Sequence, residues 1–408
     1  MTALSNAQSI ETSGFSMPPR HPVSEAVPGR TMAALQQRQQ AGDLRVLTAA
    51  AYRALVAQEG LEQAFAQTDV VAAADAGFCD QGSLALSLGP SDPPIRLREV
   101  EVSGVAGLVC GSSGELQLPL GGGLADPARG SGAQVVTALL AGHRVALSAL
   151  GEPTRLQPRL ELSGSVTLAQ LGGARLLLQR AIVENGIVAV SSAEGLLQTA
   201  YGPLLGPLAS GLYSAAGPGS IGLTMPALSQ LGPGSPVLVG GALGWIVGSG
   251  SGHNPAVARA ASGHALGPGV TAAVMVDLAD LSATGLRSCF LAGHGAALLV
   301  PIAAPVPLLT LQQAAQAAAG ASELEAPVLD LAVPRRVKPR LASVSYDDLL
   351  AGSIWLEARR IRCAPSHSPA LAAAAAQQLV DRLQRGCFPL QPAMAALSQR
   401  SALVPLDL

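Results

Sequence analysis

The spacing of apolar and polar positions divides the N-terminal part of the chain into helices followed by strands. Thr31 can cap a helix over MAALQQRQQ that ends at Gly42, and Thr48 can cap a second helix that ends at Gly60. The apolar run DVVAAADAGF then predicts a strand that ends at Cys79. Further strands are predicted over SLALSLG and over the alternating residues IRLREVEVSGV. This half of the chain therefore mixes both element types.

The stretch from residue 185 to residue 258 is dominated by apolar residues, Gly and Pro. Apart from His253, its only charged residue is Glu194. Such a composition excludes long helices, and buried backbone groups must be paired, so we expect strands joined by tight turns, including a strand pair over VLVGGALGWIVG. The last amphipathic run, PALAAAAAQQLVDRLQRGCF, predicts a helix closed by Gly386. The pattern indicates a mixed α/β fold with a large apolar Gly/Pro-rich sheet region, whose strand order it does not specify.

We expect three parts of the chain, of which only the first is set apart by its composition. Residues 1–29 are rich in Ser, Pro and Glu and lack a basic start before an apolar run, which predicts a disordered leader rather than a secretory signal. Residues 30–392 form the predicted functional domain, as one unit or as two subdomains. Residues 393–408 form a C-terminal tail.

Charge argues against two classes of partner. The 25 Lys and Arg residues are balanced by 27 Asp and Glu residues, so no basic face for nucleic acid is expected. The uncharged run from Leu291 to Leu311 is long enough to cross a bilayer. However, Pro301, Pro305 and Pro307 would break a helix there, so we expect a buried strand and an extended loop, and no membrane partner.

The five cysteines are odd in number and contain no CxxC pair, which argues against a disulfide framework and against a metal or iron–sulfur cage. We therefore expect no metal and a reducing, cytoplasmic setting. Cys79 stands out because it ends a predicted strand and precedes the polar residues DQGS; backbone donors of a turn there would favour its thiolate. The alternative is a small buried hydrophobic residue. Cys110 and Cys289 lie in apolar runs and are predicted to serve packing.

Six further residues are candidates for substrate binding. The rigid SDPP turn either aims Asp92 at a substrate amine or at Arg96, or is only a turn. His253 and Asn254 follow a Gly-rich loop without the context of a dinucleotide site, so they bind a small polar ligand or hold a turn. Arg335 and Arg336 clamp a carboxylate or form a solvated surface.

Three motifs in order, GFC…LGPSDPPI, LVGGALGWIVGSGSGHNP and PVLDLAVPRRVKPRLASVSYDDLLAGSI, resemble those of the homocysteine biosynthesis family, the L-aspartate semialdehyde sulfurtransferases. The resemblance extends from about Arg30 to about Pro392. It implies that a thiolate, matched by Cys79, carries sulfur as a persulfide to L-aspartate 4-semialdehyde, and that reduction releases homocysteine. No cofactor would be bound; a sulfide or persulfide donor is required, and electrons would come from a separate ferredoxin-like redox protein. For that substrate we infer, from the residues and not from the resemblance, that Asp92 would fit the ammonium and Arg335 or Arg336 the carboxylate.

The sequence departs from the family at one position. A second functional cysteine is expected in the region that here reads GEPTRLQPRLEL, and Leu156 occupies its place. Leucine can neither hold a persulfide nor form a disulfide. Three hypotheses follow: Cys79 works with an external thiol, Cys110 has taken the second role, or the chain is a binding or regulatory homologue that has lost sulfur transfer.

Overall fold

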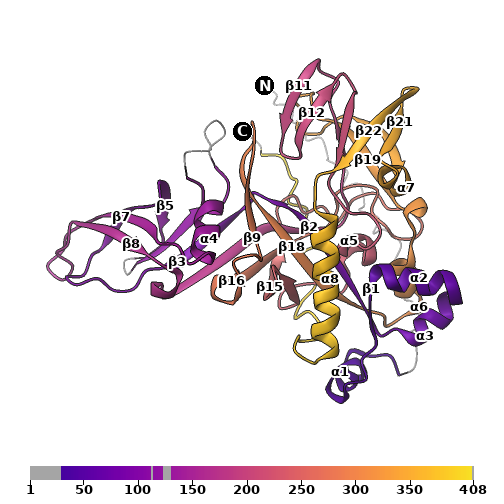
Figure 1. Ribbon diagram of the computed structural model, residues 1–408, viewed down its shortest axis with the longest axis horizontal. Coiled ribbons are helices and arrows are strands. Elements are labelled where there is room, and N and C mark those ends of the chain that lie inside the picture. Colours follow the sequence, from indigo (N-terminus) through magenta and orange to yellow (C-terminus); the bar gives the residue numbers. More distant parts are fainter. Residues whose placement is uncertain (1–28, 112–113, 123–129, 407–408) are drawn as a thin grey trace, which may run out of the picture.

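The computed structural model describes residues 29–111, 114–122 and 130–406. The predicted leader, residues 1–29, lies outside these residues apart from Gly29. Helices and mixed sheets alternate along the chain, which confirms the predicted α/β class. Figure 1 shows a body of helices and sheets from which an arm made mostly of strands projects to one side.

Across the described residues, the largest sheet has 14 strands and runs through both body and arm. Its body strands lie in the order β1 (Val46–Thr48), β2 (Val70–Cys79), β18 (Gly295–Pro307), β14 (Pro236–Val239), β15 (Ala242–Ser249), β16 (Thr271–Asp277) and β9 (Gly173–Val183), with β17 (Arg287–Leu291) paired to β18. The sheet continues into the arm as β3 (Gly82–Ser87), β6 (Glu115–Pro119), β5 (Val105–Val109), β4 (Leu97–Val102), β7 (Val145–Gly151) and β8 (Glu161–Val166).

The arm consists of strands β3 to β8 and helix α4 (Gly132–Leu140), which Ser131 caps. The chain enters it directly from β2, because β3 begins three residues after Cys79. The predicted strand over residues 95–105 is interrupted: Ser103 and Gly104 adopt positive φ angles and form the turn between β4 and β5. The alternating pattern identified the strand, but the two-residue turn within it converts one strand into a hairpin.

A second sheet of six strands lies beside the carboxyl end of β2. Its order is β20 (Arg340–Ser345), β19 (Glu325–Asp330), β10 (Val188–Val190), β13 (Ser210–Tyr213), β22 (Arg359–Pro365) and β21 (Ser353–Leu356). A separate hairpin pairs β11 (Gly195–Thr199) with β12 (Gly202–Gly206). The predicted strand-and-turn character of residues 185–258 is thus confirmed, with one short helix, α5 (Ile221–Thr224), among the strands.

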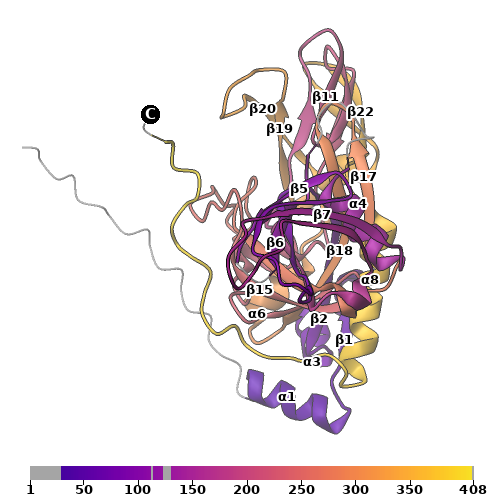
Figure 2. The ribbon, with the colours of Figure 1, turned by 90° about the vertical axis from the view of Figure 1, so that its left-hand side faces the viewer.

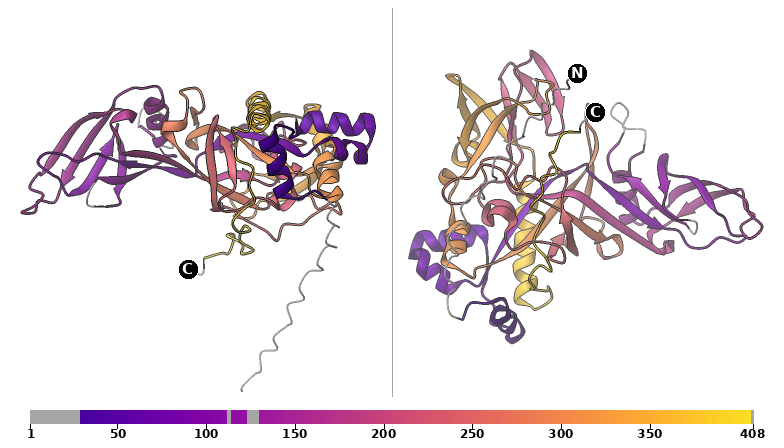
Figure 3. Two further views of the ribbon diagram at one scale, coloured as in Figure 1. Left: turned by 90° about the horizontal axis from the view of Figure 1, so that it is seen from below. Right: turned by 180° about the vertical axis from the view of Figure 1, so that it is seen from behind.

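Helices cover the body. The predicted N-terminal helices are α1 (Met32–Ala41), α2 (Ala49–Glu59) and α3 (Leu61–Gln67), and Thr31 and Thr48 cap the first two as expected. The others are α6 (Leu311–Ala318), α7 (Tyr346–Leu350) and α8 (Pro369–Gln384), with short 3-10 turns at Leu168–Gln170, Pro226–Leu228, Leu278–Asp280 and Ala321–Glu323. In Figures 2 and 3, α8 lies on one side of the body and the chain after residue 390 runs along the other.

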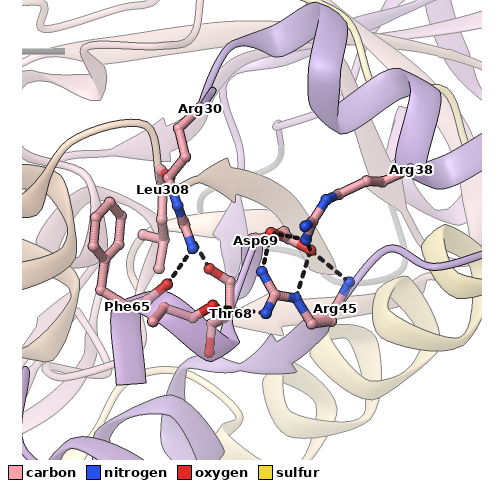
Figure 4. A network of polar contacts seen from close by, with 8 residues as sticks. Arg30, Arg38, Arg45, Phe65, Thr68, Asp69 and Leu308 are labelled. Atoms are coloured by element: carbon pink, nitrogen blue, oxygen red, sulfur yellow. Dashed lines mark hydrogen bonds and ion pairs between the residues drawn. The ribbon is translucent and has the colours of Figure 1, made fainter. Parts of the chain in front are cut away.

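The N-terminal helices are joined to the sheet by a buried carboxylate, Asp69. Arg45 contacts it with two side-chain nitrogens at 2.7 and 3.0 Å, and Arg38 contacts both of its oxygens at 2.9 Å (Figure 4). Burial works against ionisation, but the hydrogen bonds from Arg45 and Arg38 lower the pKa of Asp69 on balance. Arg30 donates to the backbone carbonyls of Thr68 and Leu308 at 2.9 Å beside this pair. The body is therefore fixed by charge as well as by apolar packing.

Within the apolar run from Leu291 to Leu311, β18 confirms the predicted buried strand, but the extended loop expected at the prolines is wrong, because all three prolines lie within β18. In an antiparallel strand the N–H and C=O of one residue face the same neighbour. The carbonyl of Pro301 accepts from Gly240 and that of Pro307 from the Gln230 side chain, both at 2.9 Å, while β2 pairs along the other edge. The backbone positions at which these prolines lack an N–H therefore face away from β2, so β18 can contain them and still pair with β2. In the described part of the chain, no helix is long and apolar enough to cross a membrane.

Candidate functional site

A cavity of about 190 Å³ lies at the carboxyl end of β2, between the body sheet and the second sheet. We call it the inner cavity. Cys79, the last residue of β2, lies in its wall with Arg180 from β9. Tyr201 comes from the turn between β11 and β12, and His294 from the turn between β17 and β18. Four segments distant in sequence therefore converge where β2 ends.

The Cys79 side chain faces this cavity but is itself buried, with 6% of its surface exposed. Its Sγ lies 3.7 Å from the carbonyl oxygen of Arg180. Burial raises the pKa of the Cys79 thiol to about 12; Asp80 and, more weakly, Cys289 add to this rise, and the Arg180 charge opposes it. The free cavity thus holds a protonated thiol at neutral pH, contrary to the thiolate that the sequence favoured.

Charged and polar groups surround this thiol. His294 Nε2 lies 2.9 Å from Asp80 Oδ2, and both side chains are partly exposed to the cavity. Among the described residues, the Arg180 guanidinium has no hydrogen-bond or ion-pair partner, although its charge opposes the rise that burial causes in the pKa of Tyr201. An unpaired guanidinium facing a small cavity is suited to binding an anion such as a carboxylate.

One face of β2 continues the cavity inward from Cys79. Alternate residues share a face of a strand, so Asp75, Gly77 and Cys79 point to the same side. A Cβ added at Gly77 would meet nothing within 4 Å, so this position leaves open space between the carboxyl and the thiol. Asp75 accepts a hydrogen bond from the Ile221 N–H at 3.0 Å, and burial raises its pKa to about 6. His367 pairs with Gly77, and burial lowers its pKa.

The structure places the SDPP turn at the outer end of the arm, away from this cavity. Asp92 is exposed there, and Arg96 forms an ion pair with Glu152 at 3.6 Å. Leu156, which stands where the second family cysteine is expected, is 84% exposed in the loop between β7 and β8 beside that turn. Since β3 alone advances about 20 Å, these residues lie far from Cys79 along the arm.

The candidates from the later motifs also separate. His253 is buried, and its two ring nitrogens lie 3.1 Å from the Thr271 carbonyl and 2.7 Å from the Ser398 carbonyl, so it holds the C-terminal segment. Asn254 and Arg336 line a neighbouring cavity, and Arg336 donates to the Leu403 carbonyl. Arg335 is exposed and lines neither cavity. The structure therefore brings Cys79 together with none of the six predicted binding residues in the inner cavity.

The other cysteines do not supply a second thiol beside Cys79. Cys79 pairs across the sheet with Leu298, and Cys289 pairs with Ala297, the preceding residue of β18. Consecutive residues point to opposite faces, and the two cysteines lie two strand spacings apart, about 10 Å, so a disulfide would require movement of the backbone. Cys110 and Cys387 are exposed, and Cys363 is buried in the second sheet. No group of three or more potential metal ligands occurs within the described ranges.

Sequence reasoning overlooked Asp80, Arg180, Tyr201 and His294. Two of them carried a recognisable signal: Asp80 directly follows the end of a predicted strand, and His294 is the only ionisable side chain in the run from Leu291 to Leu311. Arg180 and Tyr201 gave none, because only the pairing of β9 with β3 and the position of the β11–β12 hairpin bring them to Cys79.

Comparison with known proteins adds the family context. Residues 44–390 match the family model described as "Homocysteine biosynthesis enzyme, sulfur-incorporation". Over 367 residues the chain is 29% identical to the L-aspartate semialdehyde sulfurtransferase of Methanosarcina acetivorans, covering 88% of this chain and 70% of that protein. Over 339 residues it is 28% identical to the enzyme of the same name from Methanocaldococcus jannaschii, covering 80% of this chain and 64% of that protein. No solved structure matches.

Proposed function

Since the chain belongs to the family of sulfur-incorporating homocysteine biosynthesis enzymes, we propose that it is a sulfurtransferase that converts L-aspartate 4-semialdehyde to L-homocysteine. The observation that carries the proposal is the meeting of the Cys79 thiol with Arg180 and Asp80 in one small cavity. A cysteine, a cation and an anion are the groups that an amino-acid aldehyde receiving sulfur would require.

The substrate has a carboxylate, an ammonium group and an aldehyde. In the proposal, Arg180 binds the carboxylate, because its guanidinium has no partner in the described part of the chain and offers two parallel N–H donors. Asp80, next to Cys79 in sequence, binds the ammonium. Arg180 and Asp80, which line the inner cavity, thus replace the residues that the sequence suggested for these roles, namely Arg335 or Arg336 for the carboxylate and Asp92 for the ammonium. The aldehyde carbon then lies beside the Cys79 sulfur.

The chemistry begins from a persulfide on Cys79. Its outer sulfur forms a C–S bond with the aldehyde carbon, and the aldehyde oxygen leaves as water. One electron pair reduces that carbon to the level of a thiol, and a second pair cleaves the S–S bond and returns Cys79 as a thiol. Both pairs and the accompanying protons come from outside the chain, and a separate ferredoxin-like redox protein is the proposed source.

A protonated Cys79 must lose its proton before it can accept sulfur. The Asp80–His294 pair lies beside the thiol and is the proposed acceptor, since His294 already contacts a carboxylate at 2.9 Å. Binding of a substrate ammonium at Asp80 would also remove one cause of the raised thiol pKa.

A second candidate function is favoured by two observations. The Cys79 thiol is buried with a pKa of about 12, and the position of the second family cysteine is Leu156 at the outer end of the arm. A homologue that binds L-aspartate 4-semialdehyde or a related amino acid without transferring sulfur would have these features.

One experiment separates the two candidates. The full chain would be incubated with L-aspartate 4-semialdehyde, a reductant, and either sulfide or an organic persulfide, and homocysteine would be quantified. Sulfur transfer predicts product with the wild type and at least about a hundredfold less with Cys79→Ser, while Cys387→Ser, a change at an exposed thiol, leaves the rate unchanged. If calorimetry shows that the aldehyde binds but no homocysteine forms with either donor, the binding homologue is the correct function.

A further inference from the structure

A second, larger cavity of about 910 Å³ adjoins the inner one. We call it the outer cleft. The two share five lining residues: Arg180, Ala200, Tyr201, Pro268 and His294. A molecule in the outer cleft therefore faces the cavity in which Cys79 lies.

The outer cleft is cationic. Arg336, Lys338 and Arg340 line it together with Arg180, and none of the described residues that line it is Asp or Glu. The protein as a whole carries a net charge of −2, so this concentration of positive charge is local. Four cations without a lining carboxylate constitute a site for an anion.

Most hydrogen-bond donors of these cations have no partner among the residues that the structure describes. Arg336 donates to the Leu403 carbonyl and Arg340 to the Ser343 hydroxyl, both neutral acceptors. Lys338 donates to the Val333 carbonyl at 2.6 Å and to the Leu331 carbonyl at 3.4 Å. The positive charge of Lys338 also helps to lower the pKa of the buried Asp330 carboxyl. The Oδ1 atom of that carboxylate already accepts hydrogen bonds from the N–H groups of Ser192 and Ala332. Each guanidinium thus keeps free N–H groups for a ligand.

Much of the remaining wall of the outer cleft is apolar and includes Leu197, Val257, Leu266, Leu329 and Val337, while Gln198, Thr199 and Asn254 add polar groups. A ligand that fills it has anionic groups and an aliphatic part. Inorganic sulfide or a bare phosphate would contact only the cationic side chains and leave the apolar wall of the cleft without a partner.

The route of sulfur to Cys79 suggests what this ligand does. Leu156 holds no sulfur, and Cys289 lies on the opposite face of the sheet, so sulfur must reach Cys79 from solution through the cavities. Sulfide could become a persulfide on a single cysteine only with an oxidant. A donor that already carries sulfane sulfur needs none.

We propose that the outer cleft binds an anionic low-molecular-weight persulfide, charged through carboxylates or phosphates, and presents its outer sulfur to Cys79. The proposal rests on the sulfur transfer proposed above. Cys79 attacks the outer sulfur, a new S–S bond forms on Cys79, and the S–S bond of the donor breaks. The Asp80–His294 pair accepts the proton of Cys79 and passes it to the departing thiolate, so the exchange involves no net oxidation or reduction.

The test follows the appearance of one added sulfur atom on Cys79 by intact mass spectrometry of the full chain. Donors are the persulfides of glutathione (carboxylates), coenzyme A (phosphates) and cysteamine (a cation). The variant Arg336→Gln/Lys338→Gln/Arg340→Gln is compared with Arg359→Gln/Arg360→Gln/Arg362→Gln, which removes the same charge from exposed positions of β22. We expect the first variant to take up sulfur about tenfold more slowly from an anionic donor, with no slowing for cysteamine persulfide and none in the second variant.

Equal uptake from anionic and cationic donors, or equal rates in both variants, would overturn the inference. Calorimetry with reduced glutathione and reduced coenzyme A measures occupancy of the outer cleft independently of sulfur transfer. Binding that is lost in the first variant supports the site; binding without sulfur uptake on Cys79 overturns delivery to that cysteine. Sulfur uptake on Cys79 without homocysteine formation would instead refute the proposed function and leave the donor site standing.

Discussion

The chain leaves the body at Cys79 and reaches the SDPP turn only a dozen residues later, yet these two points lie at opposite ends of the arm. The body end has a buried thiol, an unpaired guanidinium and a carboxylate–imidazole pair in one cavity. The outer arm end has an exposed Asp92, a solvated ion pair and the exposed side chain of Leu156. Proximity of motifs in sequence therefore does not imply a shared site, because a strand that projects from the body separates them.

The largest expected difference between the two regions concerns stability. Asp69→Ala in the body removes a buried carboxylate and leaves the charges of Arg38 and Arg45 without their anionic partner, and we expect a loss of about 3–5 kcal/mol in the free energy of unfolding. Glu152→Ala at the outer arm removes an exposed partner of Arg96, for which we expect at most about 0.5 kcal/mol. Urea denaturation of both variants measures the contrast; similar losses would show that the arm is held as tightly as the body.

A pH-dependent effect is expected from Asp75, on the inner wall of the same cavity. Its pKa is raised to about 6 by burial, so the folded state holds this proton more tightly than the unfolded chain, and the stability gained below about pH 4 is lost as pH rises through 6. The difference corresponds to at most about 3 kcal/mol. Asp75→Asn should therefore be more stable than the wild type at pH 8, with the gap closing towards pH 4. Asp43→Asn, an exposed control, should show no such dependence.

The next effect concerns substrate binding. Arg180 and Arg175 lie on the same strand, but only Arg180 lines the inner cavity, whereas Arg175 is exposed in the part of β9 that pairs with the arm. Loss of one charge-assisted contact of about 1.5–3 kcal/mol should raise the KM for the aldehyde by about 10- to 150-fold in Arg180→Gln. Arg175→Gln should leave KM unchanged. An unaltered KM in both variants would remove Arg180 from the substrate carboxylate.

The sequence predicted the elements of this fold well, because caps such as Thr31 and Thr48, the apolar run before Cys79 and the prolines of β18 act locally. It could not predict the order of the sheet, in which β9 lies between β16 and β3 although the three are far apart in the chain. That order decides the site. Cys79 was identified from its position at a strand end, whereas Arg180 and Tyr201 reach it only through long-range pairing.

The environment of each candidate was also beyond the sequence. His253 follows a glycine-rich loop and offered a polar ring to a ligand, but both ring nitrogens are occupied by backbone groups of the body and the C-terminal segment. Burial likewise decides the protonation of Cys79, and it depends on how β9 and the second sheet close over the end of β2. Neither the partners of His253 nor the protonation of Cys79 can be predicted from the neighbouring residues in the sequence.

The smallest expected effect tests the separation of the two regions directly. Leu156→Cys restores a thiol where the family cysteine is expected, and because Leu156 is 84% exposed we expect a change in stability within about 0.5 kcal/mol. The arm holds this position far from Cys79, so oxidation should produce no disulfide between residues 79 and 156 within one chain. Peptide mapping under non-reducing conditions measures the cross-link, with Leu160→Cys, 59% exposed on the same arm, as the matched control.

A 79–156 disulfide formed by Leu156→Cys but not by Leu160→Cys would show that the outer arm reaches the inner cavity, either by bending or in a second copy of the chain. Mapping in a mixture of isotopically light and heavy chains would distinguish these two arrangements, and either would make the replacement of that cysteine by leucine a change within the catalytic site.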